Sequence, residues 1–166
     1  MRFVAVGQHD PLAEPLLAEL AVEYSSRYDV TEQGTAAWLR SHPAEAFAAP
    51  DGALLIGLLG EQPVTGGAFE RFDAHTAELK RIWTHSGYRQ RGYATALLTE
   101  LEALIAARGY RRIYLTTGDR QPEAEALYEA TGYTRLTDPL PAEQGERSDG
   151  GQQREIHPIA FAKVLA

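Results

Sequence analysis

The sequence predicts a mixed α/β (α+β) fold in which helices cover both faces of a central sheet. The first observation is the order of the expected elements, β-α-α-β-β-β-α-β-α-β-β, which is typical of one sheet packed between helices. The second is an amphipathic helical stripe over residues 94–105, and the third is a turn sequence, Gly-Glu-Gln-Pro at residues 60–63, between two apolar stretches. At 166 residues the chain has the size of one domain, which we expect to span residues 1–166.

Two helical segments are expected in the N-terminal third of the chain. The first begins at Pro11 or at Pro15, because proline is accepted in the first turn of a helix. The second covers residues 31–47, where we expect Gly34 to interrupt the helix and Pro43 to end it. The apolar face of the first helix recurs at helical spacing and consists of Leu16, Leu17, Leu20 and Tyr24.

The strands of the N-terminal half are expected to form an edge strand, a hairpin and a third, irregular strand. In the last of these, Leu79 and Ile82 are three positions apart, and a regular two-residue alternation would place them on opposite faces of the sheet. A β-bulge near residues 80–83 would bring both side chains to one face. The four strands are expected at residues 2–6, 53–59, 64–72 and 77–84.

The C-terminal half contains the clearest helical pattern of the chain, which Gly109 ends. A further helix begins at Pro122 and ends at Gly132, and residues 138–155, rich in Pro, Gly and charge, are expected to be a mobile loop. The apolar stripe of the first of these helices consists of Ala94, Leu97, Leu98, Leu101, Leu104 and Ile105. Strands are expected at residues 112–117, 133–136 and 156–165.

The composition excludes several classes of function. The chain has no cysteine, which excludes disulfides, thiolate zinc sites, iron–sulfur clusters and a cysteine nucleophile. Its five histidines show no metal-ligand spacing, so we expect no metal. With 16 Lys and Arg residues against 23 Asp and Glu residues, the net charge of −7 argues against nucleic acid as a partner. No signal peptide or membrane-length apolar stretch is found, so we expect no membrane partner and a cytoplasmic location.

Positive charge is concentrated in one segment of this acidic chain. Residues 80–91 contain two lysine or arginine residues at each end and no acid, a local charge of +4, so that the other residues carry −11. The segment leads directly into a helix through a turn that contains Gly92. A helix N-terminus presents unpaired N–H groups and the positive end of the helix dipole, and glycine allows a phosphate to approach the backbone. We therefore expect an anion pocket here.

Three motifs at consistent separation resemble the GNAT N-acetyltransferase superfamily. Arg89, Gly92 and Ala94 match its coenzyme pyrophosphate loop, Gln/Arg-x-x-Gly-x-Gly/Ala. Residues 78–84 look like its bulged fourth strand, and residues 121–133 look like its Asn-x-x-Ala-x-x-Leu-Tyr-x-x-x-Gly-Phe/Tyr segment, with glutamine in place of the asparagine. The resemblance covers residues 52–136. It implies a mixed, mostly antiparallel sheet of six or seven strands flanked by about four helices.

The resemblance implies an acetyl-CoA-dependent N-acetyltransferase that moves the acetyl group directly to a primary amine of a small molecule or peptide. Because no cysteine is present to form an acyl-enzyme, direct transfer in a ternary complex is favoured. The alternative is a non-catalytic module on the same fold that binds an acyl-CoA or regulates a partner, since a fold does not fix its function. Members of the superfamily are often dimers, so a homodimer is an open expectation.

The resemblance also assigns coenzyme-binding residues. A backbone N–H freed by the bulge would meet the thioester oxygen, the pantetheine arm would run along the end of the fourth strand, and N–H groups of residues 90–95 would hold the pyrophosphate. Arg89 or Arg91 would add positive charge. The residues expected to bind acetyl-CoA are Ile82, Trp83, Thr84, Arg89, Gln90, Arg91, Gly92, Tyr93, Ala94, Thr95 and Gln121.

Two residues are candidates for proton transfer. Tyr128 matches the superfamily's general acid, although a tyrosine at this spacing is also typical of a packed helix face. Glu78 matches the general base of one branch, and its alternative role is an ion pair with Lys80 or Arg71, with a water chain serving as the base. The aromatic residues Tyr24, Tyr28 and Trp38 are expected either to line an acceptor pocket or to pack in the core.

Overall fold

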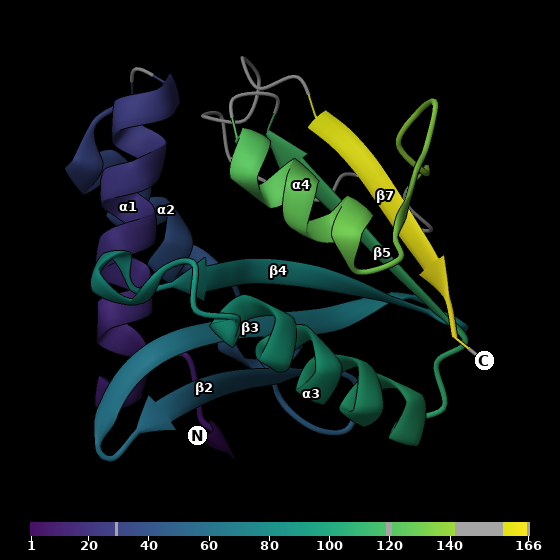
Figure 1. The fold of residues 1–166 in the computed structure, drawn as a ribbon, viewed down its shortest axis with the longest axis horizontal. Coiled ribbons are helices and arrows are strands. Elements are labelled where there is room, and N and C mark those ends of the chain that lie inside the picture. Colours follow the sequence, from purple (N-terminus) through teal and green to yellow (C-terminus); the bar gives the residue numbers. More distant parts are fainter. Residues whose placement is uncertain (29, 119–120, 142–157, 166) are drawn as a thin grey trace.

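The computed structural model describes residues 1–28, 30–118, 121–141 and 158–165. Their seven strands form one sheet in the order β1-β2-β3-β4-β5-β7-β6 (Figure 1). Strands β4 and β5 run parallel, and all other neighbours in the sheet are antiparallel. The expected mixed, mostly antiparallel sheet with four helices is confirmed. Most of the loop predicted at residues 138–155 lies outside the described residues.

The strands are close to their expected positions: β2 has the expected bounds, β3, β4 and β5 are slightly longer, and β1 and β6 are shorter. The strands are β1 (Arg2–Ala5), β2 (Ala53–Leu59), β3 (Gln62–Asp73), β4 (Thr76–Thr84), β5 (Arg112–Gly118), β6 (Thr134–Arg135) and β7 (Pro158–Val164). The helices are α1 (Glu14–Tyr28), α2 (Glu32–Ser41), α3 (Tyr93–Ala107) and α4 (Pro122–Ala130), with short 3₁₀ helices η1 (Pro11–Ala13), η2 (Ala44–Phe47) and η3 (Ser86–Tyr88). No helix in the described ranges is both long enough and apolar enough to cross a bilayer.

For the N-terminal helices, the predicted start is confirmed and one predicted interruption is not found. Both candidate prolines are used, since Pro11 begins η1 and Pro15 lies in the first turn of α1. The expected interruption at Gly34 is wrong. Helix α2 starts just before Gly34, whose N–H donates to the Thr31 hydroxyl at 3.0 Å, so this glycine lies in a capped first turn. The break comes at Pro43, after which η2 continues.

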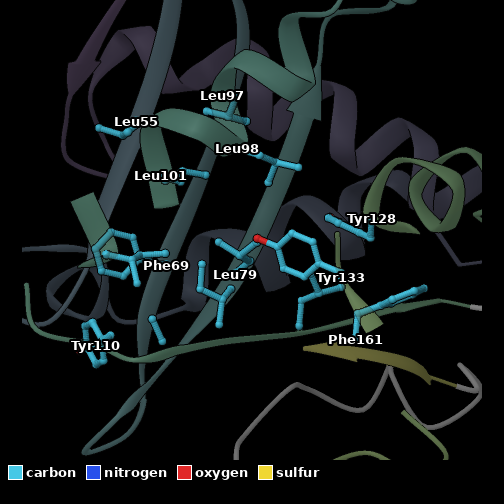
Figure 2. Packing of buried hydrophobic residues seen from close by; sticks show 14 of the residues in the cluster. Leu55, Phe69, Leu79, Leu97, Leu98, Leu101, Tyr110, Tyr128, Tyr133 and Phe161 are labelled. Carbon is cyan, nitrogen blue, oxygen red and sulfur yellow. The ribbon is translucent and has the colours of Figure 1, made fainter. Parts of the chain in front are cut away.

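Each face of the sheet has its own hydrophobic core. On one face, the leucine stripe of α3 packs against Leu55, Phe69 and Leu79, and the aromatic residues of α4 and β7 complete this cluster (Figure 2). On the other face, the leucines of α1 pack against Leu54 and Ile56 of β2. Alternate residues of β2 therefore enter opposite cores, as a strand buried on both sides requires.

The predicted bulge in β4 is confirmed. Opposite β3, the register passes from Gly66↔Trp83 to Ala68↔Lys80, so that two residues of β4, Arg81 and Ile82, stand against Gly67 alone. The backbone of Arg81 adopts a left-handed conformation, with φ of 59°. A Cβ atom on Gly67 would lie 2.6 Å from Ile82 Cδ1, so glycine is needed for the bulged residue to pack here.

The sheet opens between its two parallel strands. Pairing between β4 and β5 ends at Glu78↔Tyr114, and beyond this point the two strands separate (Figure 1). The C-terminal end of α1 and the N-terminal end of α4 meet across this opening. There Arg27 forms an ion pair with Glu123, and Gln121 Nε2 donates to the Tyr28 hydroxyl at 3.5 Å. The opening and the bulge therefore lie at the same place in the fold.

Candidate functional site

Two pockets meet beside the bulge. The first has a volume of about 360 Å³ and lies between β4, β5 and the helices α1 and α2. The second has a volume of about 540 Å³ and lies between the end of β4, the first turn of α3 and helix α4. The residues that line both pockets are Ile82, Gln121, Ala124 and Tyr128. A molecule in one pocket would therefore contact a molecule in the other at these four side chains.

The second pocket gathers most of the residues expected to bind the coenzyme. Arg91 and Tyr93 are the exceptions and do not line it. The Arg91 guanidinium lies 5.3 Å from the centroid of the Tyr88 ring, and the Tyr93 ring lies 6.4 Å from the same ring. The expected residues that do line it are Ile82, Trp83, Thr84, Arg89, Gln90, Gly92, Ala94, Thr95 and Gln121.

The first turn of α3 has the properties of an anion site. Gln90 and Gly92 both have positive φ values, 61° and 83°, which turn the backbone sharply before the helix. Ala96 N–H donates to Gly92 O, so the N–H groups before Ala96 have no acceptor within the helix. The first turn contains no acidic residue. The helix dipole and these N–H groups therefore favour a phosphate at this end of the pocket.

The positive charge of Arg89 is partly compensated by α1. Its guanidinium pairs with Glu23 and also donates from Nε to the Thr84 carbonyl at 3.4 Å. Glu23 lies 4.0 Å from Arg27, which in turn pairs with Glu123 in the first turn of α4. A chain of ion pairs thus links the loop before α3 to α1 and α4 along the second pocket.

The partly buried carboxylate of Glu19 fixes the loop that precedes α3. Glu19 of α1 accepts hydrogen bonds from Trp83 Nε1 at 2.9 Å, from the Ser86 N–H at 2.9 Å and from the Ser86 hydroxyl at 2.7 Å. Burial alone would raise the pKa of Glu19, but these hydrogen bonds outweigh burial and lower the pKa below its ordinary value. Glu19 therefore fixes both the end of β4 and the start of the loop.

The first pocket has an aromatic wall from the N-terminal helices and a charged wall from β4. Tyr24 and Trp38 line it with their rings edge to face at 6.4 Å, so these two aromatics belong to the pocket as well as to the core beneath it. Glu78 also lines the pocket and is 5% exposed. Lys80 Nζ lies 3.5 Å from Glu78 Oε2, so Glu78 both faces the pocket and forms the alternative ion pair.

Tyr128 lies where the two pockets join. Its side chain is 5% exposed and packs against Tyr133 and Phe161, with ring centroids 5.6 and 5.7 Å away (Figure 2). No residue in the described part of the chain forms a hydrogen bond with the Tyr128 hydroxyl. Burial raises the pKa of Tyr128 well above its ordinary value, so the hydroxyl keeps its proton at neutral pH. Tyr128 is thus both a packed residue and a protonated donor at the junction.

The structure divides the four cations that the sequence grouped into one segment. Lys80 and Arg81 line the first pocket, Arg89 lines the second, and Arg91 lines neither. The sequence pattern placed Arg81 with the other cations in the expected anion pocket, whereas its side chain lines the first pocket, because its direction depends on a left-handed backbone conformation that the residue type does not predict. His42, also missed, reaches the first pocket only through the fold of α2 onto β4.

Within the described ranges, no group of three His, Asp or Glu side chains could hold a metal ion.

Comparisons with known proteins find relatives in sequence and in fold. An acetyltransferase of Pectobacterium atrosepticum is 30% identical over 84 residues, which cover 51% of this chain and 58% of that protein. A GNAT-family acetyltransferase structure from Staphylococcus aureus superposes with a TM-score of 0.73 at 16% identity, covering 99% of this chain and all of that one. An N-acetyltransferase from Thermoplasma acidophilum, solved with coenzyme A, superposes with a TM-score of 0.68 at 15% identity, covering 99% of this chain and all of that one. The two structures show a shared fold.

The family model for acetyltransferases of the GNAT family matches residues 14–133, which include α1, the bulged strand, the loop before α3 and the whole of α4. The chain therefore belongs to the acetyltransferase (GNAT) family.

Proposed function

We propose that this protein is an acetyl-CoA-dependent N-acetyltransferase that transfers the acetyl group directly to a primary amine of a small molecule or peptide. The observation that carries the proposal is the junction of the two pockets at Ile82 and Tyr128. A thioester bound in the second pocket and an amine bound in the first would meet there. In the reaction, the amine nitrogen bonds to the carbonyl carbon, the carbon–sulfur bond breaks with its electron pair on sulfur, and the amine proton is lost.

The second pocket fits a phosphorylated coenzyme. The N–H groups of the first turn of α3 would hold the pyrophosphate, and that turn contains no acidic residue to repel it. Arg89 would exchange part of its contact with Glu23 for a phosphate oxygen. The backbone of Thr84 and the side chain of Gln121, both lining the pocket, would bind the amide groups of the pantetheine arm.

The bulge supplies backbone groups for the thioester carbonyl. Arg81 and Ile82 stand together against the single residue Gly67 and have no regular pairing with β3, and the pairing with β5 has already ended at Glu78. A fixed backbone N–H directed at a developing oxyanion is worth several kcal/mol, roughly 3, in an enzyme site. We therefore assign the polarisation of the carbonyl to the N–H of Ile82 or Trp83.

Tyr128 is assigned to the leaving sulfur. Its hydroxyl is protonated at neutral pH and has no competing hydrogen-bond partner among the described residues. An alkyl thiol such as cysteine has a pKa near ~8.5, below that of a buried tyrosine, so a complete proton transfer to sulfur would be uphill. The hydroxyl therefore stabilises the departing sulfur as a hydrogen-bond donor, and this stabilisation is present when negative charge develops.

Glu78 is assigned to the amine. It lines the first pocket, and Lys80 at 3.5 Å holds its carboxylate in place. A carboxylate in the acceptor pocket can bind an ammonium group and accept its proton, directly or through a water. The side chain lies on the same strand as the bulge, four residues before Ile82, so one rigid element would position both the base and the carbonyl-binding N–H groups.

The first test separates an enzyme from a binding module. Binding of acetyl-CoA would be measured by calorimetry, and release of the free thiol would be followed with a panel of amines. Binding together with amine-dependent thiol release supports the proposal. Tight binding without thiol release across polyamines, amino acids, aminoglycosides and peptides would favour the non-catalytic module instead.

The second test concerns Tyr128. Tyr128→Phe is expected to lower kcat by about 10²-fold or more, as is typical for the loss of a fixed hydrogen-bond donor to a developing negative charge. The control is Tyr110→Phe, a tyrosine of the same core that lines neither pocket and whose hydroxyl donates to the Asp51 carbonyl. An unchanged kcat in Tyr128→Phe would remove Tyr128 from the mechanism.

The third test concerns Glu78. Glu78→Gln is expected to lower kcat/KM for the amine and to remove the acidic limb of its pH profile. The KM for acetyl-CoA should change little, because Glu78 does not line the second pocket. A profile that keeps its acidic limb at the same pH would assign the base to another group or to a water.

A further inference from the structure

One cation of the first pocket has only uncharged partners. The Arg81 guanidinium donates to the side-chain oxygen of Gln8 at 2.7 Å and to the backbone carbonyl of Leu39. It also lies over the Phe47 ring, 5.1 Å from the ring centroid. In the described part of the chain, Arg81 has no carboxylate within ion-pair distance.

The neighbouring charged groups of this region form direct pairs with one another. Lys80 Nζ lies 3.5 Å from Glu78 and 3.9 Å from Glu70, and His42 Nε2 lies 2.9 Å from Glu70. With a neutral His42, the two carboxylates balance Lys80 and Arg81, and Glu70 attracts Arg81 from beyond ion-pair distance. In the described part of the chain, Arg81 differs from Lys80 in having no carboxylate in direct contact.

The guanidinium of Arg81 retains hydrogen-bonding capacity toward the pocket. It carries five N–H donors, and the described acceptors, Gln8 and Leu39, account for two hydrogen bonds. Burial lowers the pKa of Arg81 to about 10, so the group is still charged at neutral pH. Because water screens a half-buried charge only weakly, an anion that enters this pocket gains more from Arg81 than it would from a surface arginine.

The remainder of the pocket is apolar on the side of the N-terminal helices. Tyr24 and Trp38 form an aromatic corner, and Leu20, Leu39 and Phe47 extend this surface. The volume of about 360 Å³ lies within the range of pockets for small molecules. The pocket therefore combines an apolar body, a carboxylate at Glu78 and a guanidinium that, among the described residues, has no carboxylate in direct contact.

We infer that the acceptor is an amine that also carries a carboxylate, such as an amino acid with an apolar side chain, and that Arg81 binds this carboxylate. The inference rests on the proposed function and specifies its substrate class. An arginine binds a carboxylate through two parallel N–H···O bonds, which also fix its orientation. Polyamines are disfavoured, because a second ammonium group would approach Arg81 and Lys80 while the carboxylates of the pocket are already engaged.

The test uses acceptors that differ only in the carboxylate. Thiol release from acetyl-CoA is measured with phenylalanine, phenylalaninamide and phenethylamine, and with the corresponding leucine series. Rates are expressed per concentration of neutral amine, because the three compounds differ in basicity. The kcat/KM values of phenylalanine and leucine are expected to be at least about tenfold higher than those of their amides and of the corresponding amines without a carboxyl group. This difference corresponds to the free energy of one hydrogen-bonded charge pair.

Two variants assign the preference to Arg81. Arg81→Gln keeps a donor for Gln8 and Leu39 but removes the charge, and the preference for the carboxylate should fall to about twofold or less. Arg40→Gln is the matched control. Arg40 is an exposed arginine of α2 that pairs with Glu14 and lines neither pocket, and its loss should leave the preference unchanged.

Binding without turnover separates this inference from the proposed function. Binding of N-acetylphenylalanine and of N-acetylphenylalaninamide to the coenzyme A complex is compared by calorimetry. If no amine is turned over but the carboxylate binds tighter in an Arg81-dependent manner, the proposed function fails and the carboxylate site stands.

Three outcomes overturn the inference. Turnover in which phenylalaninamide or phenethylamine equals phenylalanine leaves the proposed function intact and removes the carboxylate site. A preference that survives in Arg81→Gln assigns the carboxylate to another residue. Equal binding of the acid and the amide without any turnover contradicts both proposals. If Arg81→Gln does not fold, Arg81→Lys takes its place: a preference that is unchanged without the two parallel N–H donors assigns the carboxylate to another residue.

Discussion

The contact between Gly67 and the bulged residue Ile82 allows a quantitative test of the architecture of the site. In Gly67→Ala, the new Cβ atom would lie 2.6 Å from Ile82 Cδ1, 3.3 Å from Leu97 Cδ2 and 3.4 Å from Leu101 Cδ1. The first distance is shorter than a Cβ contact can be, so Ile82 must move. The two leucines are completely buried, which leaves Ile82 little room on that side.

We expect Gly67→Ala to destabilise the protein by about 1–3 kcal/mol, the usual cost of adding a methyl group to a packed core. Ile82→Val removes the clashing Cδ1 atom and by itself should cost about 0.5–1.5 kcal/mol. The double variant should be more stable than the sum of the single changes predicts, by about 1 kcal/mol. The rescue is partial, because the contacts of the new methyl group with Leu97 and Leu101 remain.

The assay is urea denaturation followed by tryptophan fluorescence and circular dichroism at neutral pH. Gly7→Ala serves as the control, because a Cβ atom at Gly7 would meet no atom within 4 Å. Gly67→Ala should also raise the KM values for both acetyl-CoA and the amine, since Ile82 lines both pockets. Additive effects within about 0.3 kcal/mol in the double-mutant cycle would refute the contact.

The remaining predictions concern the loop before α3. In Gly92→Ala, no atom obstructs the new methyl group, but φ of 83° is strained for alanine, so stability should fall by about 1–2 kcal/mol and acetyl-CoA should bind more weakly by calorimetry. Glu23→Gln should release Arg89 and tighten acetyl-CoA binding by roughly two- to fivefold, more at low salt than at high salt; weaker binding at low salt would contradict this. The folded-state pKa of Glu19 is lowered, so its stabilisation is present above pH 4.5 and is lost as the pH falls through the folded value. The stability difference between wild type and Glu19→Gln should therefore narrow in urea titrations below pH 4.5.

The fold was predictable where the pattern of side chains is local. The spacing of Leu79 and Ile82 revealed the bulge, because a strand cannot place residues three apart on one face without an extra residue. The leucines of α3 revealed both the helix and its buried face. Gly34 misled the prediction, since the Thr31 cap satisfies the backbone of the first turn and offsets the low helix propensity of glycine.

The site was predictable only in part, because its second half is assembled from distant segments. The loop before α3 and the helix containing Tyr128 have sequence motifs, and both line the predicted pocket. The wall formed by Tyr24 and Trp38 depends on how α1 and α2 pack across β4, which no local pattern encodes. Arg81 was grouped with the coenzyme-binding cations because it is close to them in the sequence. The bulge gives its backbone a left-handed conformation and turns its side chain into the other pocket.

The separation of β4 from β5 has a mechanical consequence. Only three residue pairs join these strands, so their backbone pairing is confined to one end of the opening. The contacts of Arg27 with Glu123 and of Tyr28 with Gln121 connect α1 to α4 at the other end of the opening. Both pockets lie at this opening and share the side chains of Ile82, Gln121, Ala124 and Tyr128, so a ligand that displaces these side chains in one pocket also changes the shape of the other. Occupancy of one pocket should therefore change affinity in the other by the same factor in either direction, even without direct contact between the two ligands.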